Sequence, residues 1–155
     1  VVLSSIASFA PVEGRLEDCG MYNNDTVRVI NDNNATTGDA VIAAIKAVQD
    51  AYGRKPILIL GGADKGLPLT LLEEEVLIGA KHYVLLEGTG TQKLTLSKDS
   101  LFETLEECVE RAMYLGEEGD IILFSPGFAS FSKYFKNEYE RNDTFKKSIE
   151  KYKVM

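Results

Sequence analysis

Three polar or glycine-rich segments contain the side chains best suited to binding an anion. They are residues 31–37, 61–66 and 125–130. Lys65 supplies a point positive charge, the hydroxyls of Thr36 and Ser130 supply hydrogen-bond donors, and the glycines let the backbone approach a ligand closely. Together the segments predict one anion site. The glycine-rich segment 61–66 taken alone is equally compatible with an ordinary turn.

Neither common nucleotide-binding glycine motif is present in complete form. Residues 61–66 lack the spacing of a P-loop, which requires Gly-x-x-x-x-Gly-Lys followed by Ser or Thr, so we do not expect this segment to cradle a nucleoside triphosphate. Gly88-Thr89-Gly90 lacks the third glycine of a dinucleotide fingerprint. Any nucleotide contact must therefore use other groups.

The remaining reactive side chains are better explained by packing or solvation. His82, the only histidine, starts a predicted buried strand and receives no role. Cys19 and Cys108 lie far apart without Cys-x-x-Cys spacing, which predicts neither a disulfide framework nor a metal site. The glutamates at 73–75 and 117–118 are expected on solvated helix faces or ends. Four aromatic residues with roughly helical spacing are expected to pack: Tyr134, Phe135, Tyr139 and Phe145.

Alternating strands and helices position these segments. Apolar and β-branched runs predict strands at 26–30, 57–60, 82–86 and 121–124. Helical periodicity predicts a helix that starts at Thr37 or Asp39 and stops at Gly53, then helices at 69–77 and 101–115, and one or two helices at 131–152 with a break near Asn142-Asp143. We therefore predict an α/β domain, Rossmann-like, with a mostly parallel sheet and helices on both faces. The carboxyl ends of such strands are where ligands bind.

Size and composition indicate one ordinary globular domain. A chain of 155 residues can bury roughly 70% of its unfolded surface. Its 45% hydrophobic and 26% charged residues argue against disorder and coiled coil. With a net charge of -7 and no dense Lys or Arg cluster, nucleic acid is not an expected partner. The apolar runs are far shorter than the ~20 residues that span a bilayer.

Residues 1–10 are apolar but carry no basic leader, so we do not interpret them as a signal peptide. They also lack a start signal of their own and resemble the end of an element that continues from upstream. We therefore expect the chain to be a piece of a longer protein. With two widely separated cysteines, a cytoplasmic location is expected.

Taken in order, four segments resemble the C-terminal domain of the Mur ligases, and within them the D-glutamate-adding branch, MurD. The segments are Gly14-Arg15-Leu16-Glu17, Asn31-Asp32-Asn33-Asn34-Ala35-Thr36-Thr37, Gly61-Gly62-Ala63-Asp64-Lys65-Gly66, and Ser125-Pro126-Gly127-Phe128-Ala129-Ser130 followed by Phe135-Lys136-Asn137 and Arg141. The family patterns are roughly His-Arg-Leu-Glu, Asn-Asp-Ser-Lys-Ala-Thr-Asn, Gly-Gly-x-Asp-Lys-Gly and Leu-Ser-Pro-Ala-Cys-Ala-Ser-Phe-Asp-x-Phe-Lys-Asn. The similarity spans nearly the whole chain, and the Phe-Lys-Asn segment favours the D-glutamate-adding branch.

This resemblance implies a domain that closes over the site of an ATP-dependent amide-forming ligase in peptidoglycan precursor synthesis. In such ligases ATP phosphorylates the carboxylate of UDP-N-acetylmuramoyl-L-alanine, and the amine of D-glutamate attacks the acyl phosphate. By resemblance, Arg15 contacts the ATP phosphates and Asp32 the ribose. Thr36, Lys65 and Ser130 hold the carboxylates of D-glutamate, which agrees with the anion chemistry of these side chains.

The resemblance also implies that catalysis needs parts beyond this chain. The sequence has no P-loop, no recognisable magnesium-binding carboxylate set and no UDP-binding domain. ATP and Mg²⁺ are expected in the complete enzyme and none tightly bound to this domain. We expect the chain to be a monomer that folds independently, has no catalytic residues of its own and is inactive alone. Residues 1–12 are interpreted as the remnant of a linker from the central domain.

The sequence departs from the family pattern at several positions. Asn34 replaces the motif lysine, Asn33 replaces the serine and Gly14 replaces the histidine. One residue is inserted near position 134, so either Glu138 or Tyr139 takes the aromatic substrate-contact position.

Two other functions compete with this interpretation. A folylpolyglutamate-synthase-type ligase resembles the Mur ligases in this domain, but the Ser-Pro-Gly-Phe-Ala-Ser segment argues against it. A non-catalytic α/β binding module, such as a receiver-like domain, is also compatible with the fold. Asp32 ends a strand as a receiver aspartate would, yet no acidic pair follows the first strand.

Overall fold

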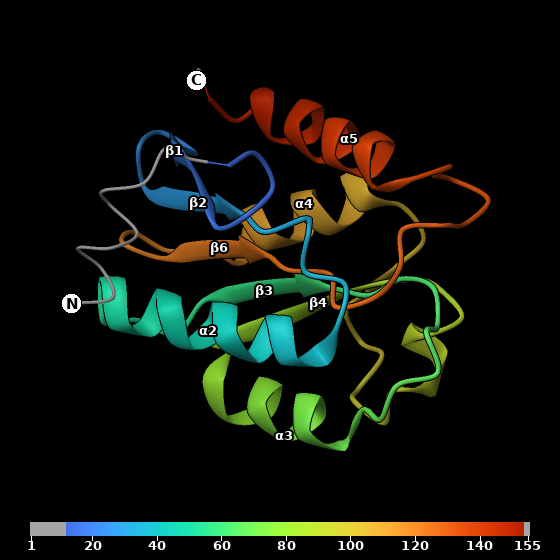
Figure 1. Ribbon diagram of the computed structural model, residues 1–155. Helices are drawn as coiled ribbons and strands as arrows, with labels where there is room; N and C mark the ends of the chain where they lie inside the picture. Colours follow the sequence, from blue (N-terminus) through green and yellow to red (C-terminus); the bar gives the residue numbers. More distant parts are fainter. Residues whose placement is uncertain (1–11, 154–155) are drawn as a thin grey trace.

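A six-stranded sheet with the order β1-β2-β6-β3-β4-β5 forms the centre of the fold (Figure 1). The computed structural model describes residues 12–153. The strands are β1 Glu17–Tyr22, β2 Val27–Asn31, β3 Ile57–Leu60, β4 His82–Leu86, β5 Leu101–Phe102 and β6 Ile121–Phe124. All neighbouring strands run parallel except β1 and β2. The predicted α/β class with a mostly parallel sheet is confirmed.

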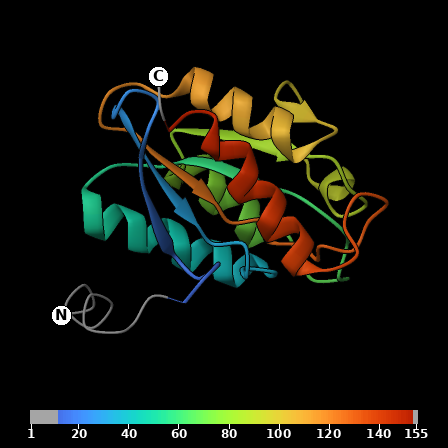
Figure 2. The ribbon, with the colours of Figure 1, turned by 90° about the horizontal axis from the view of Figure 1, so that it is seen from above.

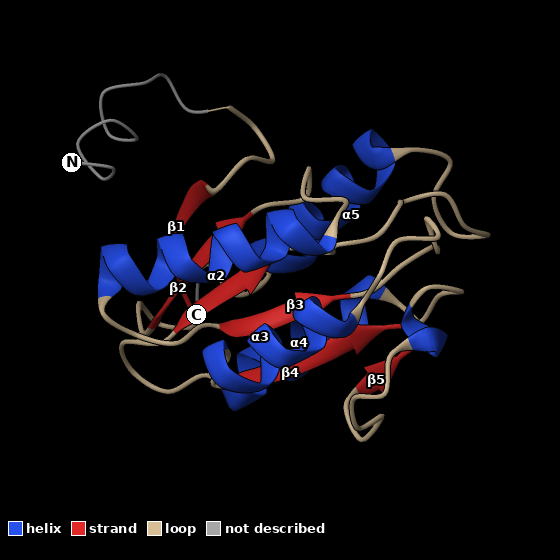
Figure 3. Ribbon diagram, turned by 60° about the horizontal axis from the view of Figure 1, so that its bottom comes forward, coloured by secondary structure: helices blue, strands red, loops and turns tan. Residues whose placement is uncertain are grey.

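Helices cover both faces of this sheet. They are α2 Gly38–Tyr52, α3 Thr70–Gly79, α4 Leu105–Leu115 and α5 Glu138–Glu150, with a short 3-10 helix, η1, at Thr91–Lys93. The pair α2 and α3 lies on one face (Figure 3), and α4 and α5 lie side by side over the other (Figure 2). No helix within residues 12–153 is both long and apolar enough to cross a membrane.

The central strands are apolar at every position because both faces of the sheet are buried. Side chains alternate between the faces along a strand. In β3, Ile57 and Ile59 join the core beneath α4 and α5, whereas Leu58 and Leu60 join the core beneath α2 and α3. All four are fully buried.

Local caps set the ends of α2, as the sequence predicted. The Thr37 hydroxyl accepts a hydrogen bond from the Ala40 amide at 3.2 Å. Gly53 ends the helix with a left-handed φ of 67°, a conformation that glycine adopts without steric cost. Of the two predicted caps, Thr37 is therefore the one used.

The predicted start of one helix was wrong. The helix expected at 101–115 begins only at Leu105, because Thr104 caps it by accepting from the Glu107 amide at 3.2 Å. Leu101–Phe102 instead forms the edge strand β5. The hairpin strand β1 was not predicted at all.

The break expected near Asn142-Asp143 is also wrong, because α5 continues through both residues. The buried Asn142 uses its side chain in tertiary contacts: its oxygen accepts from Asn31 Nδ2 at 2.8 Å, and its Nδ2 donates to Glu13 at 3.0 Å. The interpretation of residues 1–10 lies outside the described residues, as do residues 1–11 of the proposed linker remnant 1–12.

Candidate functional site

The three segments singled out in the sequence meet at the carboxyl edge of the sheet. They follow the adjacent strands β2, β3 and β6. Backbone hydrogen bonds join them: Gly127 N donates to Ala35 O at 2.7 Å, and Ala63 and Ala129 exchange bonds of 2.9 and 3.1 Å. The segments therefore form one connected rim rather than separate turns.

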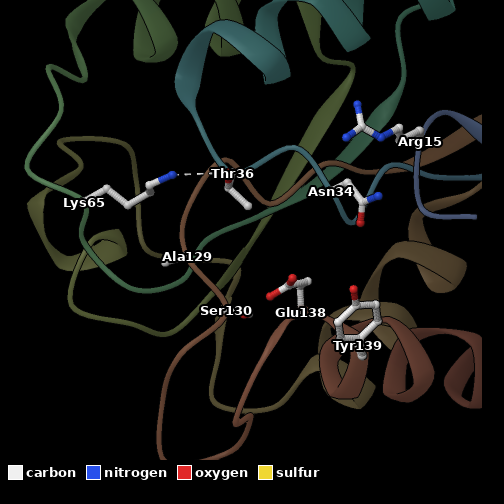
Figure 4. A pocket seen from close by; sticks show the side chains of 8 residues that line it. All are labelled: Arg15, Asn34, Thr36, Lys65, Ala129, Ser130, Glu138 and Tyr139. Carbon is white, nitrogen blue, oxygen red and sulfur yellow. Dashed lines mark hydrogen bonds between the residues drawn. The ribbon is translucent and has the colours of Figure 1, made fainter.

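This rim encloses part of a pocket of about 490 Å³ (Figure 4). The residues that line it are Arg15, Asn34, Thr36, Lys65, Ala129, Ser130, Glu138 and Tyr139. Four of the five predicted ligand-contact residues are among them, namely Arg15, Thr36, Lys65 and Ser130. Asp32 is the fifth, and it does not line the pocket.

The pocket offers a cation and two hydroxyls next to each other. Lys65 Nζ lies 3.2 Å from Thr36 Oγ1 and is otherwise open to solvent. Ser130 is only 9% exposed, and no hydrogen bond within residues 12–153 engages its hydroxyl. This combination suits a carboxylate or phosphate, which accepts charge-assisted hydrogen bonds.

Asp32 supports the pocket from behind. Its Oδ1 accepts from Leu16 N at 3.1 Å, which anchors the turn that carries Arg15, and its Oδ2 accepts from Ser125 Oγ at 2.8 Å. Burial raises the pKa of Asp32 to about 6, and the bonds from Ser125 and Leu16 and the charge of Arg15 oppose that rise. Asp32 therefore links Leu16, just before β1, to Ser125, just after the end of β6.

Arg141 is a buried cation beneath the pocket that the sequence argument left without a role. It is 1% exposed and donates to the Asn33 carbonyl at 2.7 Å, to the Asn33 side-chain oxygen at 2.7 Å and to the Phe128 carbonyl at 3.0 Å. Burial lowers its pKa to about 10. Arg141 belongs to the fourth segment that resembles the family, but the residue types of that segment did not indicate that this arginine would be buried.

Glu138 and Tyr139, the two candidates for the aromatic substrate-contact position, both line the pocket. The expectation that Tyr139 packs in the core is wrong, since it is 73% exposed, and Tyr134 is also exposed and bonds to Glu103. Phe135 and Phe145 are buried, as expected. Tyr139 and Phe145 differ because α5 turns only one face toward the sheet.

The residues that were assigned no chemistry stay outside this pocket. Cys108 is buried and Cys19 partly buried, both as free thiols. Burial raises the pKa of Cys19 to about 11 and that of Cys108 further, so neither is a ready nucleophile. His82 is exposed rather than buried. Among residues 12–153 no group of three or more His, Cys, Asp or Glu side chains is placed to hold a metal.

Comparison with known proteins gives consistent relatives. The chain is 36% identical to a UDP-N-acetylmuramoylalanine–D-glutamate ligase from Roseiflexus sp. over 157 residues, which cover 96% of this chain and 32% of the relative. It is 38% identical to the ligase of the same name from Chlamydia pneumoniae, covering 93% and 34%. The corresponding ligase from Salinibacter ruber is 33% identical, covering 97% and 32%. The chain thus spans about a third of the length of these curated relatives.

A solved structure supports the fold. A murein peptide ligase from Psychrobacter arcticus superposes with a TM-score of 0.60 at 14% identity, over 94% of this chain and 32% of that one. At this identity the likeness concerns the fold alone. No family model matches the chain.

Proposed function

We propose that the chain is the C-terminal, substrate-closing domain of a UDP-N-acetylmuramoylalanine–D-glutamate ligase, because ligases of that name match it over nearly its whole length. The observation that carries the proposal is the convergence of Thr36, Lys65 and Ser130 on one pocket. These are the residues that the family resemblance assigns to D-glutamate.

D-Glutamate is a dicarboxylate, and this pocket has matching donors. In the proposal, Lys65 and the hydroxyls of Thr36 and Ser130 hold its carboxylates by charge-assisted hydrogen bonds. Holding D-glutamate in this pocket of the closing domain keeps its amine beside the activated carboxylate of the muramyl substrate. Such positioning lowers the barrier by turning an encounter between two molecules into a reaction within one complex.

In the proposal, ATP contacts this domain through Arg15 and Asp32. The Arg15 side chain is exposed at the pocket, and no hydrogen bond or ion pair within residues 12–153 engages its guanidinium, so it is available to phosphate oxygens. The Asp32 carboxylate is occupied on both oxygens, but each oxygen can accept a further bond from a ribose hydroxyl. The bound nucleotide would supply the phosphoryl group that activates the muramyl carboxylate. We assign its Mg²⁺ to the rest of the enzyme.

The complete enzyme would thus join D-glutamate to UDP-N-acetylmuramoyl-L-alanine, using ATP, with this chain as one of its domains. Since ATP and a UDP-linked precursor are cytoplasmic metabolites, we infer that it acts in the cytoplasm. We expect the chain alone to be a monomer without ligase activity. Turnover by the purified chain, free of other ligases, would contradict that expectation.

A domain exchange tests this proposal. The matching third of the Roseiflexus ligase is replaced by this chain, and ADP release is measured with UDP-N-acetylmuramoyl-L-alanine or with a folate as acceptor. We expect release that requires the muramyl acceptor and D-glutamate together, and that falls when the exchanged domain carries Lys65→Ala. A folded chimera that binds ATP and the muramyl substrate but couples no D-glutamate would refute the proposal. Coupling to the folate alone would favour a folylpolyglutamate-type ligase.

A further inference from the structure

The pocket contains a carboxylate that the proposed binding of two acidic groups does not explain. Glu138 is the first residue of α5 and lines the pocket. Figure 4 shows its carboxylate turned toward the interior of the ring of lining residues. Within residues 12–153 its side chain has no hydrogen-bond or ion-pair partner, although Lys65 and Arg15 line the same pocket. An ionised carboxylate in an anion site weakens binding unless the ligand also carries a positive group.

Among the described residues, no hydrogen bond at the start of α5 uses the side chain of Glu138, although its charge in the first turn also favours the helix dipole. The N-terminus of α5 is already capped by Asn137, whose side-chain oxygen accepts from the Glu140 amide at 3.0 Å. Glu140 turns back to accept from Lys136 N at 3.4 Å, so a second acidic side chain already serves this turn. Glu138 is therefore free to face the ligand.

The backbone of Glu138 is fixed even though its side chain is exposed. Its carbonyl accepts from Asn33 Nδ2 at 2.9 Å, and Asn33 is held in turn by two hydrogen bonds from the buried Arg141. The start of α5 is thus tied to the loop that carries Thr36. The anchored backbone fixes the position from which the Glu138 side chain reaches toward the donors opposite.

The charges of the pocket match those of an amino acid rather than those of a simple diacid. Lys65 and the hydroxyls lie on the rim formed by the loops, and Glu138 lies on the helix side (Figure 4). Asn34 contributes a neutral amide. An α-amino dicarboxylate presents its anionic carboxylates to Lys65 and the hydroxyls, and its ammonium group to Glu138.

We propose that Glu138 binds the ammonium group of the incoming amino acid, so that the pocket selects an amino dicarboxylate over a dicarboxylate without an amine. This inference rests on the proposed function and names the group that recognises the amine. Glu138 is a specificity-determining contact in this account, and no proton transfer is assigned to it.

The experiment compares the binding of D-glutamate and glutarate, which lacks the amine, to the 155-residue chain by NMR titration. We expect the wild type to prefer D-glutamate. Glu138→Gln should weaken D-glutamate binding roughly tenfold, since a charge-assisted hydrogen bond is lost, and leave glutarate binding unchanged or tighter. Glu140→Gln, a change of the same chemistry in the same turn, should alter neither.

The remaining outcomes each overturn the inference. Equal weakening of both ligands by Glu138→Gln would show a structural role, and tighter binding of both would show simple repulsion. A wild type that binds glutarate as well as D-glutamate would contradict amine recognition while leaving the proposed function intact. A wild type that binds neither D-glutamate nor glutarate would overturn the inference, since this chain would then carry no preformed pocket for an amino dicarboxylate, and would leave the assignment to the ligase family standing.

Discussion

Arg141 on α5 holds Asn33 in the loop after β2 through two hydrogen bonds, with Nε and Nη2 each 2.7 Å from an Asn33 oxygen. A third bond reaches the Phe128 carbonyl at 3.0 Å. One buried cation therefore joins two of the loops that shape the pocket to the helix that carries Glu138. No carboxylate within residues 12–153 forms an ion pair with it.

Replacing Arg141 should destabilise the fold more than removing an exposed charge does. Arg141→Lys cannot reproduce the planar fork and leaves buried acceptors unpaired, so we expect the free energy of unfolding to fall by about 2–4 kcal/mol. Urea denaturation measures this, with Lys147→Met on the exposed side of α5 as the control. A loss no larger than that of the control would show that the three bonds contribute little.

Gly61 and Gly66 both have positive φ angles, but only Gly61 is sterically enclosed. A Cβ at Gly61 would lie 2.2 Å from the Leu86 carbonyl oxygen, whereas a Cβ at Gly66 would meet nothing within 4 Å. We expect Gly61→Ala to cost about 3 kcal/mol or more, or to prevent folding, and Gly66→Ala about 1–2 kcal/mol. Thermal unfolding of the matched pair checks this. Equal losses of stability in the two variants would contradict the close approach of Gly61, after β3, to the Leu86 carbonyl at the end of β4.

Asp32 should make stability depend on pH in a predictable direction. Its folded pKa is about 6, against about 3.9 for an unfolded aspartate. Between these values the folded chain binds more protons than the unfolded chain. The contribution of Asp32 to stability is therefore present below the lower pKa and is lost as the pH rises through the higher one. The loss is of the order of 3 kcal/mol.

Asp32→Asn should remove this dependence. We expect the stability of the variant relative to wild type to increase between pH 4 and 7, by about 2–3 kcal/mol. Urea denaturation at a series of pH values measures the difference, with the exposed Asp50→Asn as control. A difference that does not change with pH would mean that Asp32 titrates normally.

Lys65 should matter for binding but not for folding. Its ammonium group is exposed and bonded only to Thr36 within the described residues, so Lys65→Ala should change the free energy of unfolding by less than about 0.5 kcal/mol. The affinity for D-glutamate should fall roughly tenfold or more, because the cation opposite its carboxylates is lost. Calorimetric titration tests this against Lys55→Ala, which removes an exposed cation elsewhere. An unchanged affinity for D-glutamate would show that Lys65 does not contribute to binding this ligand.

The central strands and the three binding loops could be predicted because their signals are local. Ile57–Leu60 is apolar throughout, as a strand buried on both faces must be. The loops after such strands meet at one edge by the geometry of parallel sheets. The strand β1 could not be predicted in the same way: Glu17–Tyr22 is half-exposed and has no β-branched residues, and it is held by pairing with β2.

The parts of the site that escaped prediction depend on tertiary contacts. Arg141 is charged, and only the folded chain shows that it is buried against backbone carbonyls of distant loops. The insertion near position 134 left Glu138 and Tyr139 indistinguishable in sequence, whereas both line the pocket in the structure. Asn142 was expected at a helix break because it is polar, and its buried partner Asn31, 111 positions away, is apparent only in the folded chain.

The most direct measurement is an NMR titration of the chain with D-glutamate and, separately, with L-glutamate. We predict saturable shifts of the Thr36, Lys65 and Ser130 amides that are larger with the D enantiomer and are lost in Lys65→Ala. Absence of binding, shifts confined to residues outside the pocket, or equal affinity for both enantiomers would contradict the claim that this pocket receives D-glutamate.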